Sequence, residues 1–453
     1  MKVSNSIAMV LSAITAGCMM FSTNAYADAP SGKVTVTYNE TSNGPSYGLS
    51  STVDGSNVTS IISNITEGAN CSMSVCGGLE LNYNTISNNF YENYEGPTLV
   101  EGVIMNMDGG YALSLKGGNS INTTAYMQQV RDYMGESLNV GSIQINVTGG
   151  VVGKSGDSEE AIMGGGGRHC GAGSIEVNIS GGTINNLVYA GTNGGTVRTT
   201  ALNISGGTIN SDVYGGGRKN FGKVTEGTTV TLSGGTINGS VYAGGNEDKV
   251  EGTSKVIITG TGSEVSGTIS GGGVNGASVL GTSSLIFDED YVGEYAYSVK
   301  EFMELDIESA AILSALATSA KGTLVNIADN VTLTLGDVDV VDGGALEFNG
   351  GNVTITSGSI LNLGGTSITL NGTTLISEGF TVMVDSLADA TVFNVVDNAA
   401  LAALDGVTVT LKDETGTTKT VAASTVATVV PEPTTATLSL LALAGLAMRR
   451  RRK

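Results

Sequence analysis

Few residues of this chain combine the types and the spacing that catalysis or metal binding requires. His169 is the only histidine, and Cys170 follows it directly. A cysteine beside an imidazole could form a nucleophile pair or bind a metal. One histidine and one cysteine cannot complete a structural zinc site, however, and adjacent residues of a strand point to opposite faces. We therefore predict no catalytic residues and no metal site.

An acidic pair is the second candidate for chemistry. Asp337 and Asp339 are two residues apart, so they share one face of a predicted strand, and Asp342 follows closely. Paired carboxylates can act as acid and base or bind Ca²⁺, although solvated outward charges are the more common explanation. The glycine runs lack the Gly-Lys-Ser/Thr ending of a phosphate-binding loop. No cofactor is expected.

The cysteines point to an oxidising compartment only in combination with an export signal. Cys71 and Cys76 lie in the stretch CSMSVC, and we predict a local disulfide between them, with two free thiols as the alternative. Cys170 is left over once the N-terminal segment that carries Cys18 is removed.

The composition indicates an all-β protein. Glycine accounts for 67 of 453 residues, and Val, Ile and Thr alternate with polar residues. No proline occurs between Pro97 and Pro431. Strands that are paired on both sides exclude proline, because its missing N–H removes a hydrogen bond of the sheet. The formal net charge of −21 argues against a nucleic-acid partner, since phosphate contacts need clustered Lys and Arg.

The N-terminus reads as a secretory signal peptide. Residues 1–27 contain Lys2, an apolar run, and then the small-x-small pattern of Ala25 and Ala27, which predicts cleavage by signal peptidase before Asp28. A lipoprotein signal ending at Cys18 is the alternative, but it lacks the expected Leu-like residue three positions earlier.

The C-terminus contains a second targeting signal. Pro431, Glu432 and Pro433 form an extended elbow, and an uncharged apolar run from Thr434 to Met448 follows it. This run predicts a short hydrophobic helix, which the positive-inside rule would hold with its tail in the cytoplasm. The tail consists of Arg449, Arg450, Arg451, Arg452 and Lys453.

This order of features resembles the PEP-CTERM sorting signal of Gram-negative bacteria, over residues 429–453. The resemblance implies processing by an exosortase, a membrane-embedded cysteine protease, after transient anchoring in the inner membrane. It also implies delivery to the cell surface, the outer membrane or the extracellular matrix. The resemblance identifies an address and no activity.

One motif is repeated through the middle of the chain. Three gapless lines begin at Val177, Leu202 and Val230, for example LNISGGTINSDVYGG, and their starts are 25 and 28 residues apart. Weaker copies begin at Ile145 and Val256. Copies of this period predict one coil of a β-solenoid each.

Stacked coils would align equivalent residues in columns. Alternation predicts three interior aliphatic columns and one column of tyrosines that faces outward, where it could bind glycans by stacking on sugar rings. The interior columns are Ile179, Ile204 and Leu232; Ile184, Ile209 and Ile237; and Val188, Val213 and Val241. The tyrosines are Tyr189, Tyr214 and Tyr242.

The predicted fold is an all-β parallel β-helix (β-solenoid) with an irregular β-rich N-terminal cap and a C-terminal hydrophobic helix. A helical patch is also predicted near residues 308–320. The expected segments are a signal peptide (1–27), a β-rich N-terminal segment or cap (28–140), Gly-rich solenoid repeats (141–284), an acidic connecting segment (285–323), further coils and a closing segment (324–428), and the sorting signal (429–453).

The solenoid resembles, in architecture, the β-helix regions of autotransporters and bacterial adhesins. We therefore expect a non-enzymatic, exported, surface-associated structural or adhesin-like protein, with surface glycans or extracellular matrix as partners besides exosortase and signal peptidase. The alternative is a polysaccharide lyase or hydrolase on a parallel β-helix. Such an enzyme would need a groove lined by Asp, Lys and Arg, whereas most basic residues here fall between the motifs.

Overall fold

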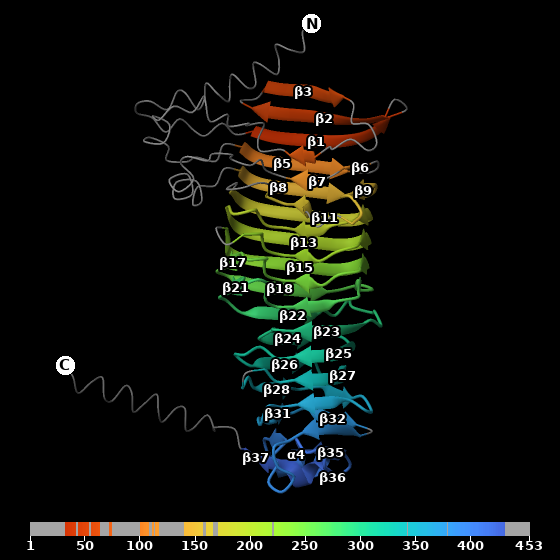
Figure 1. Cartoon of the computed structure of the whole chain (residues 1–453), viewed down its shortest axis with the longest axis vertical. Coiled ribbons are helices and arrows are strands. Elements are labelled where there is room, and N and C mark those ends of the chain that lie inside the picture. Colours follow the sequence, from red (N-terminus) through yellow and green to blue (C-terminus); the bar gives the residue numbers. More distant parts are fainter. Residues whose placement is uncertain are drawn as a thin grey trace, which may run out of the picture. The chain divides into compact units, whose positions relative to one another are not determined.

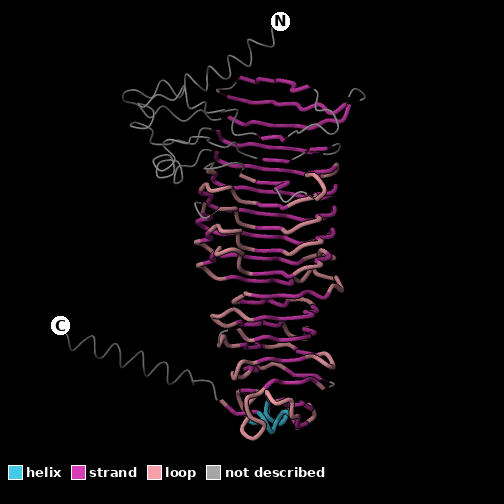
Figure 2. Tube along the Cα trace, in the orientation of Figure 1, coloured by secondary structure: helices cyan, strands magenta, loops and turns pink. Residues whose placement is uncertain are grey.

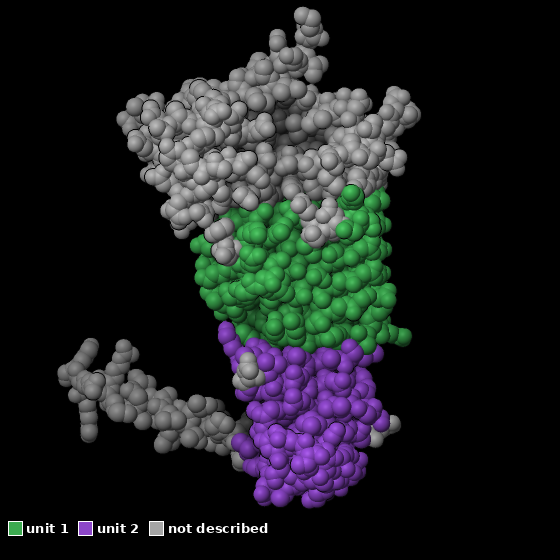
Figure 3. All heavy atoms as spheres, in the orientation of Figure 1, with its two compact units in different colours: residues 1–304 green, residues 305–453 purple. Residues whose placement is uncertain are grey.

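The chain divides into two compact units, residues 1–304 and residues 305–453 (Figure 3), and the division falls at β24 (Glu304–Ile307). The computed structural model describes residues 32–41, 44–53, 56–63, 72–74, 100–107, 111–112, 114–116, 140–156, 160–165, 171–219, 222–341, 343–377 and 379–430.

Unit 1 is a parallel β-helix whose first face is a sheet of long strands, one from each coil (Figure 1). Each strand pairs in parallel with the equivalent strand of the next coil, as the repeats predict. In order, the strands are β5 (Val100–Met107), β8 (Val140–Val147), β11 (Ala172–Ile184), β13 (Thr196–Ile209), β15 (Lys223–Ile237), β18 (Thr253–Ile258) and β22 (Ser283–Phe287).

Shorter strands form the second face of unit 1, and loops join them to the first face (Figure 2). These strands are also parallel and, apart from one shift between Glu160 and Ile162, in register from coil to coil. They are β4 (Ser72–Ser74), β7 (Ser114–Lys116), β10 (Glu160–Met163), β12 (Leu187–Tyr189), β14 (Val213–Tyr214), β16 (Val241–Tyr242), β20 (Thr268–Ser270) and β23 (Ala296–Lys300). Short strands at the corners complete the coils: β6 (Tyr111–Ala112), β9 (Val151–Val152), β17 (Lys249–Val250), β19 (Glu264–Val265) and β21 (Ser278–Val279).

The three predicted aliphatic columns are confirmed. Ile204 pairs with Ile179 on one side and Leu232 on the other, and the Ile209 and Val213 columns keep the same register. All nine side chains are at most 1% exposed. Removing each of them from water favours the stack by about 1.5–3 kcal/mol, which the ordering of the chain largely offsets.

Buried hydroxyl groups close each coil across its interior. The Thr200 hydroxyl donates a hydrogen bond to the carbonyl of Gly215 (2.6 Å), and Thr228 does the same to Ala243 (2.6 Å). Ser254 is the equivalent residue of the next coil. These hydrogen bonds satisfy carbonyl groups that would otherwise be buried without a partner. The free energy lost by burying an unpaired carbonyl group is larger than the net free energy that the hydrogen bond contributes.

Antiparallel strands form the N-terminal end of unit 1. β1 (Gly32–Thr41) pairs in parallel with β5 on one side and antiparallel with β2 (Gly44–Val53) on the other, and β2 pairs antiparallel with β3 (Ser56–Ser63). The first coils and an antiparallel cap therefore both lie within residues 28–140.

Unit 2 is built in the same way with smaller coils. One of its sheets contains β26 (Thr323–Ile327), β28 (Leu346–Asn349), β31 (Ile368–Asn371), β34 (Phe393–Val395) and β37 (Ala427–Val429). The other contains β25 (Ala311–Ala317), β27 (Thr332–Asp339), β29 (Asn352–Ile355), β30 (Ile360–Asn362), β32 (Thr374–Ser377), β33 (Phe380–Met383), β35 (Thr408–Lys412) and β36 (Thr418–Ala422).

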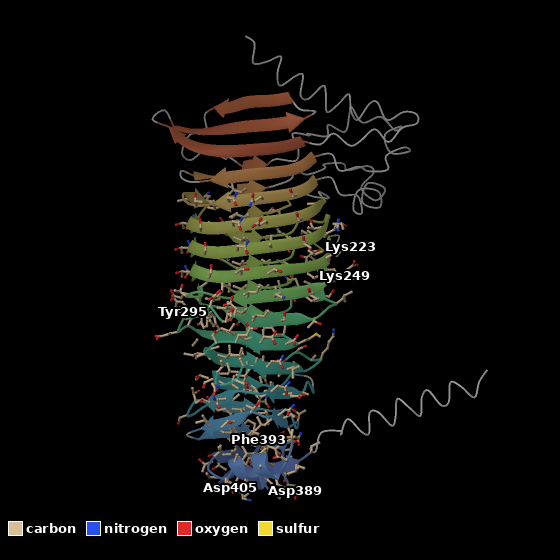
Figure 4. All side chains as sticks on the ribbon, turned by 180° about the vertical axis from the view of Figure 1, so that it is seen from behind. Lys223, Lys249, Tyr295, Asp389, Phe393 and Asp405 are labelled. Carbon is tan, nitrogen blue, oxygen red and sulfur yellow. The ribbon has the colours of Figure 1, made fainter. Side chains whose placement is uncertain are left out.

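The C-terminal end of unit 2 departs from regular coils. β36 turns back antiparallel to β35. Helix α4 (Asn398–Ala403) begins after Asp397, whose carboxylate accepts a hydrogen bond from the Ala400 N–H (2.8 Å). A 3-10 turn, η1 (Ala423–Val426), leads into β37, and Phe393 packs edge to face against Phe380 in the interior (Figure 4).

The predicted helical patch near residues 308–320 is wrong. β25 occupies this stretch, and Ala311, Leu313 and Leu316 point inward in register with β27. The alanines and leucines favour a helix locally, but the pairing with β27 and the burial of these side chains outweigh that preference. β23, β24 and β25 also lie within residues 285–323, the segment expected to connect two solenoid regions, so this segment contributes strands to the coils.

The glycine corners supply the first prediction. Gly207 has φ +81°, and a Cβ there would lie 2.8 Å from the carbonyl group of Gly181 in the preceding coil. Gly276 has φ +87° but open space around the same position, so it is a matched control. We expect Gly276→Ala to lower the free energy of unfolding by about 1 kcal/mol and Gly207→Ala to lower it by roughly 2–4 kcal/mol. Urea denaturation measures both losses. Equal losses of unfolding free energy in the two variants would show that the neighbouring coil shifts to accommodate the added Cβ, and would contradict the predicted clash.

Candidate functional site

The tyrosine column is the most unusual side-chain arrangement on the second face of unit 1. β12, β14 and β16 place Tyr189, Tyr214 and Tyr242 at one position of three consecutive coils. Successive ring centroids are 4.6 and 4.9 Å apart, and the planes differ by 11° and 10°. Each stacked pair contributes about 0.5–1.5 kcal/mol beyond its buried area. The predicted stack therefore exists.

The prediction that this stack faces the solvent is wrong. Tyr189 is fully buried and Tyr214 is 3% exposed, while Tyr242 is half-buried. Met163 belongs to the same cluster, and Val274 from a later loop packs against it. The tyrosines do alternate with the inward valines, but the loops after these strands cover them, because exposed aromatic rings are costly in water. Both ring faces of Tyr214 contact neighbouring tyrosines, which leaves no face for a sugar ring.

The hydroxyl groups of the two buried tyrosines form hydrogen bonds to polar side chains of the loops on either side of these strands. The Asn246 amide donates to the Tyr189 hydroxyl (3.1 Å), and the Tyr214 hydroxyl donates to Asp212 (3.4 Å). Burial raises the pKa of both tyrosines above the usual value of 10. Both side chains are therefore neutral at physiological pH and are unsuited to act as bases.

A buried carboxyl group lies in the loop between β16 and β17. Asp248 is 1% exposed and accepts hydrogen bonds from the backbone N–H groups of Gly217 (2.9 Å) and Lys249 (2.8 Å). Loss of contact with water raises its pKa to about 7. Arg218, which follows Gly217 in the chain, forms an ion pair with Glu160 (2.5 Å), 58 residues earlier. Within the described part of the chain, no three His, Cys, Asp or Glu residues converge to hold a metal ion.

The two aspartates of β27 form hydrogen bonds to the next coil of unit 2. Asp337 and Asp339 are both exposed on one face, as predicted. Asp337 accepts a hydrogen bond from the Ile360 N–H (2.9 Å), and Asp339 accepts one from the Asn362 amide (2.9 Å). Each carboxylate therefore binds the next coil, and Asp342 lies outside the described residues.

Columns of asparagine are a feature that the sequence analysis missed. Asn210 donates from its amide to Asn185 (3.0 Å) and accepts from Asn238 (2.8 Å), one residue per coil. Asn178 and Asn203 form a second such column with Asn146 (2.9 and 2.8 Å). The signal was present in the repeated letters NISGGTIN, whose two asparagines recur at outward positions.

Several predicted residues lie outside the described part of the chain. They are Cys71 and Cys76, His169 and Cys170, the signal-peptidase site at Ala25, Ala27 and Asp28, the motif Pro431, Glu432 and Pro433, and the tail Arg449, Arg450, Arg451, Arg452 and Lys453. Their roles stay predictions.

No helix among the described residues is both long and apolar enough to span a membrane.

Comparison with known proteins finds one match. Residues 429–453 match the family model described as the PEP-CTERM protein-sorting motif. No curated protein and no solved structure matches the chain. The chain therefore carries the C-terminal signal of exported, exosortase-processed proteins.

The buried tyrosine column predicts a graded response to truncation. Tyr214→Ala removes a ring packed on both faces, so we expect a loss of roughly 3–5 kcal/mol of unfolding free energy. Tyr242→Ala removes a half-buried ring and should cost less. Urea denaturation followed by circular dichroism measures both, and Tyr214→Phe is the control that keeps the ring. Equal costs for the two alanine variants would contradict the burial described above.

Asp248 predicts a pH dependence of stability. Its pKa is about 7 in the folded chain against 3.8 in the unfolded chain, so between these values only the folded chain holds the proton. The free energy of unfolding should therefore fall as pH rises from about 4 to about 7, by at most about 4 kcal/mol. Asp248→Asn should remove this decline.

Asp413→Asn is the control for this experiment. Hydrogen bonds from Thr415 lower the pKa of Asp413, so its contribution is lost at acid pH and not between pH 4 and 7. Asp413→Asn should therefore show the same fall in unfolding free energy between about pH 4 and pH 7 as the wild type. Identical pH profiles for wild type and Asp248→Asn would refute the assignment.

Proposed function

We propose that this protein is a non-enzymatic β-solenoid that is exported, sorted by an exosortase and retained at the cell surface or in the extracellular matrix. There it acts as a structural or adhesin-like component. Signal peptidase removes residues 1–27, and the apolar run from Thr434 to Met448 holds the chain transiently in the inner membrane of a Gram-negative bacterium. Exosortase then releases the body at Pro431, Glu432 and Pro433.

The observation that carries this proposal is the position of the sorting motif relative to the solenoid. The matched range begins at Val429, which is the last residue of β37. β37 pairs with β34, and the Val430 N–H still donates to the Val395 carbonyl (2.8 Å). Cleavage after this point leaves the described strands complete, so the processed product keeps its folded body.

The charged side chains of unit 1 support a role without catalysis. Lys223 and Lys249 lie on paired strands and share Glu251, at 3.9 and 3.3 Å (Figure 4). Arg198 pairs with Glu226 in the same manner (2.9 Å). Exposed pairs of this kind contribute about 0–1 kcal/mol each and keep the surface soluble. The catalytic alternative requires carboxylates and cations that converge on a substrate, whereas these groups neutralise each other.

Replacement of the sorting motif tests the proposal in cells. We expect the triple variant Pro431→Ala, Glu432→Ala, Pro433→Ala to remain in the membrane fraction with its C-terminal segment intact. Wild type should reach the surface fraction in a form about 2 kDa or more shorter at the C-terminus, as measured by mass spectrometry of cell fractions.

Glu414→Ala is the matched control, because it removes an exposed carboxylate from the turn between β35 and β36 without touching the motif. It should be sorted like wild type. If the triple variant reached the surface with the same mass as wild type, the motif would not direct sorting and the proposal would fail.

A further inference from the structure

Three consecutive coils of unit 1 present the same polar pair to the solvent side of the first face. Each coil contains the letters Thr-Ile-Asn, in which the isoleucine points inward and the other two side chains point outward. Successive coils are in register at this point. We call these six outward residues the Thr-Asn strip: Thr183, Asn185, Thr208, Asn210, Thr236 and Asn238.

The strip keeps unused hydrogen-bonding capacity. A side-chain amide offers two N–H donors and two acceptor lone pairs. Asn210 uses one donor on Asn185 and one lone pair on Asn238. Asn210 and Asn238 are exposed, so the remaining donor and lone pair of each are available to a ligand. The result is a repeated donor and acceptor at the spacing of the strands, about 4.8 Å.

Packing alone does not require the same residue types at these positions in all three coils. The interior tolerates exchange, since Leu232 replaces Ile204 in its column without loss of burial. Outward positions elsewhere on the same strands do vary, as where Ala201 pairs with Thr229. The asparagines have a structural reason to recur, because the column stabilises the stack. The threonines point outward beside them and need no such identity for the fold.

The strip has defined ends and no charge. In the preceding coil Val151 takes the place of the threonine, and in the following coil Glu264 does. The protein as a whole has a formal net charge of −21. An anionic polymer would be repelled by this surrounding charge, and a cationic one would find no carboxylate on the strip itself. A neutral polymer with repeated hydroxyl groups fits both conditions.

We propose that the Thr-Asn strip binds a neutral β-1,4-linked polysaccharide chain that lies along the stack, one sugar to each coil. Such a chain is an extended ribbon whose step per sugar is close to the spacing of about 4.8 Å between strands. Successive sugars are turned by half a revolution, but each of them still presents hydroxyl groups to the amide of its own coil. An α-1,4-linked chain curls and loses this match after one coil. The inference rests on the proposed surface location and names its ligand class.

The binding test uses the purified full-length protein and neutral oligosaccharides. Cellohexaose should bind with weak affinity, of millimolar order, while maltohexaose, the α-1,4-linked isomer, should not. Cellobiose should bind at least about 5-fold more weakly than cellohexaose, because it spans two coils instead of three. Isothermal titration calorimetry measures all three affinities.

Two threonines of β13 provide a matched pair of variants. Thr208→Val removes a strip hydroxyl at constant shape and leaves the asparagine column intact, and it should weaken cellohexaose binding at least about 5-fold. Thr199→Val removes an exposed hydroxyl elsewhere on the same strand and should leave binding unchanged. Thermal unfolding of both variants identifies any loss of fold.

Several outcomes would overturn the inference. They are no binding of cellohexaose up to its solubility limit, equal binding of maltohexaose, or the same loss in both valine variants. Analytical ultracentrifugation tests whether the strip instead binds a second copy of the chain. If the wild type self-associates and binds no glycan, and Thr208→Val abolishes the self-association, the strip is a contact between copies. Surface delivery of Thr208→Val in cells is measured separately, so failure of this inference is distinguishable from failure of the proposed sorting.

Discussion

The structure depends on one constraint, which is that every coil must present its backbone N–H and C=O groups in register with the next. In β11, β13 and β15 this register runs across the glycine corner, where bulges adjust it between Ile204 and Thr208. A coil has little interior of its own, so its strands are stable only while their neighbours satisfy the backbone and cover the aliphatic side chains. The absence of proline from residues 98–430 follows directly from this requirement.

Register turns any repeated residue into a column, and the chemistry of the residue decides what the column does. Isoleucine and valine columns form the interior. Hydroxyl columns such as Thr200 and Thr228 satisfy buried carbonyls, and asparagine columns bond along the stack through their amides. Unit 2 uses the same device, since Asn326 bonds to Asp306 and Asn349 bonds to Asn326. On the surface the same device repeats polar side chains from coil to coil, as in the Thr-Asn strip.

The success of prediction from sequence differed with the range of the interaction concerned. The columns that contain Ile204, Ile209 and Val213 were predictable, because alternation and a gapless repeat fix both the face and the partner of each residue. The tyrosine stack was predictable as a stack, but its burial was not, since loops that share no motif cover it. The region of β25 was misjudged for a related reason: alanine and leucine favour a helix locally, and only pairing with β27 overrides this preference.

The solenoid period, the interior columns and the sorting signal of residues 429–453 were predictable from the sequence, because each of them is encoded in short stretches of the chain. The burial of Tyr189, the isolation of Asp248 from water and the position of β37 directly before the sorting motif become visible only in the folded chain. These properties depend on contacts between residues of different coils and of non-repeating loops. Their free energies are properties of the assembled stack, and no single stretch of sequence contains them.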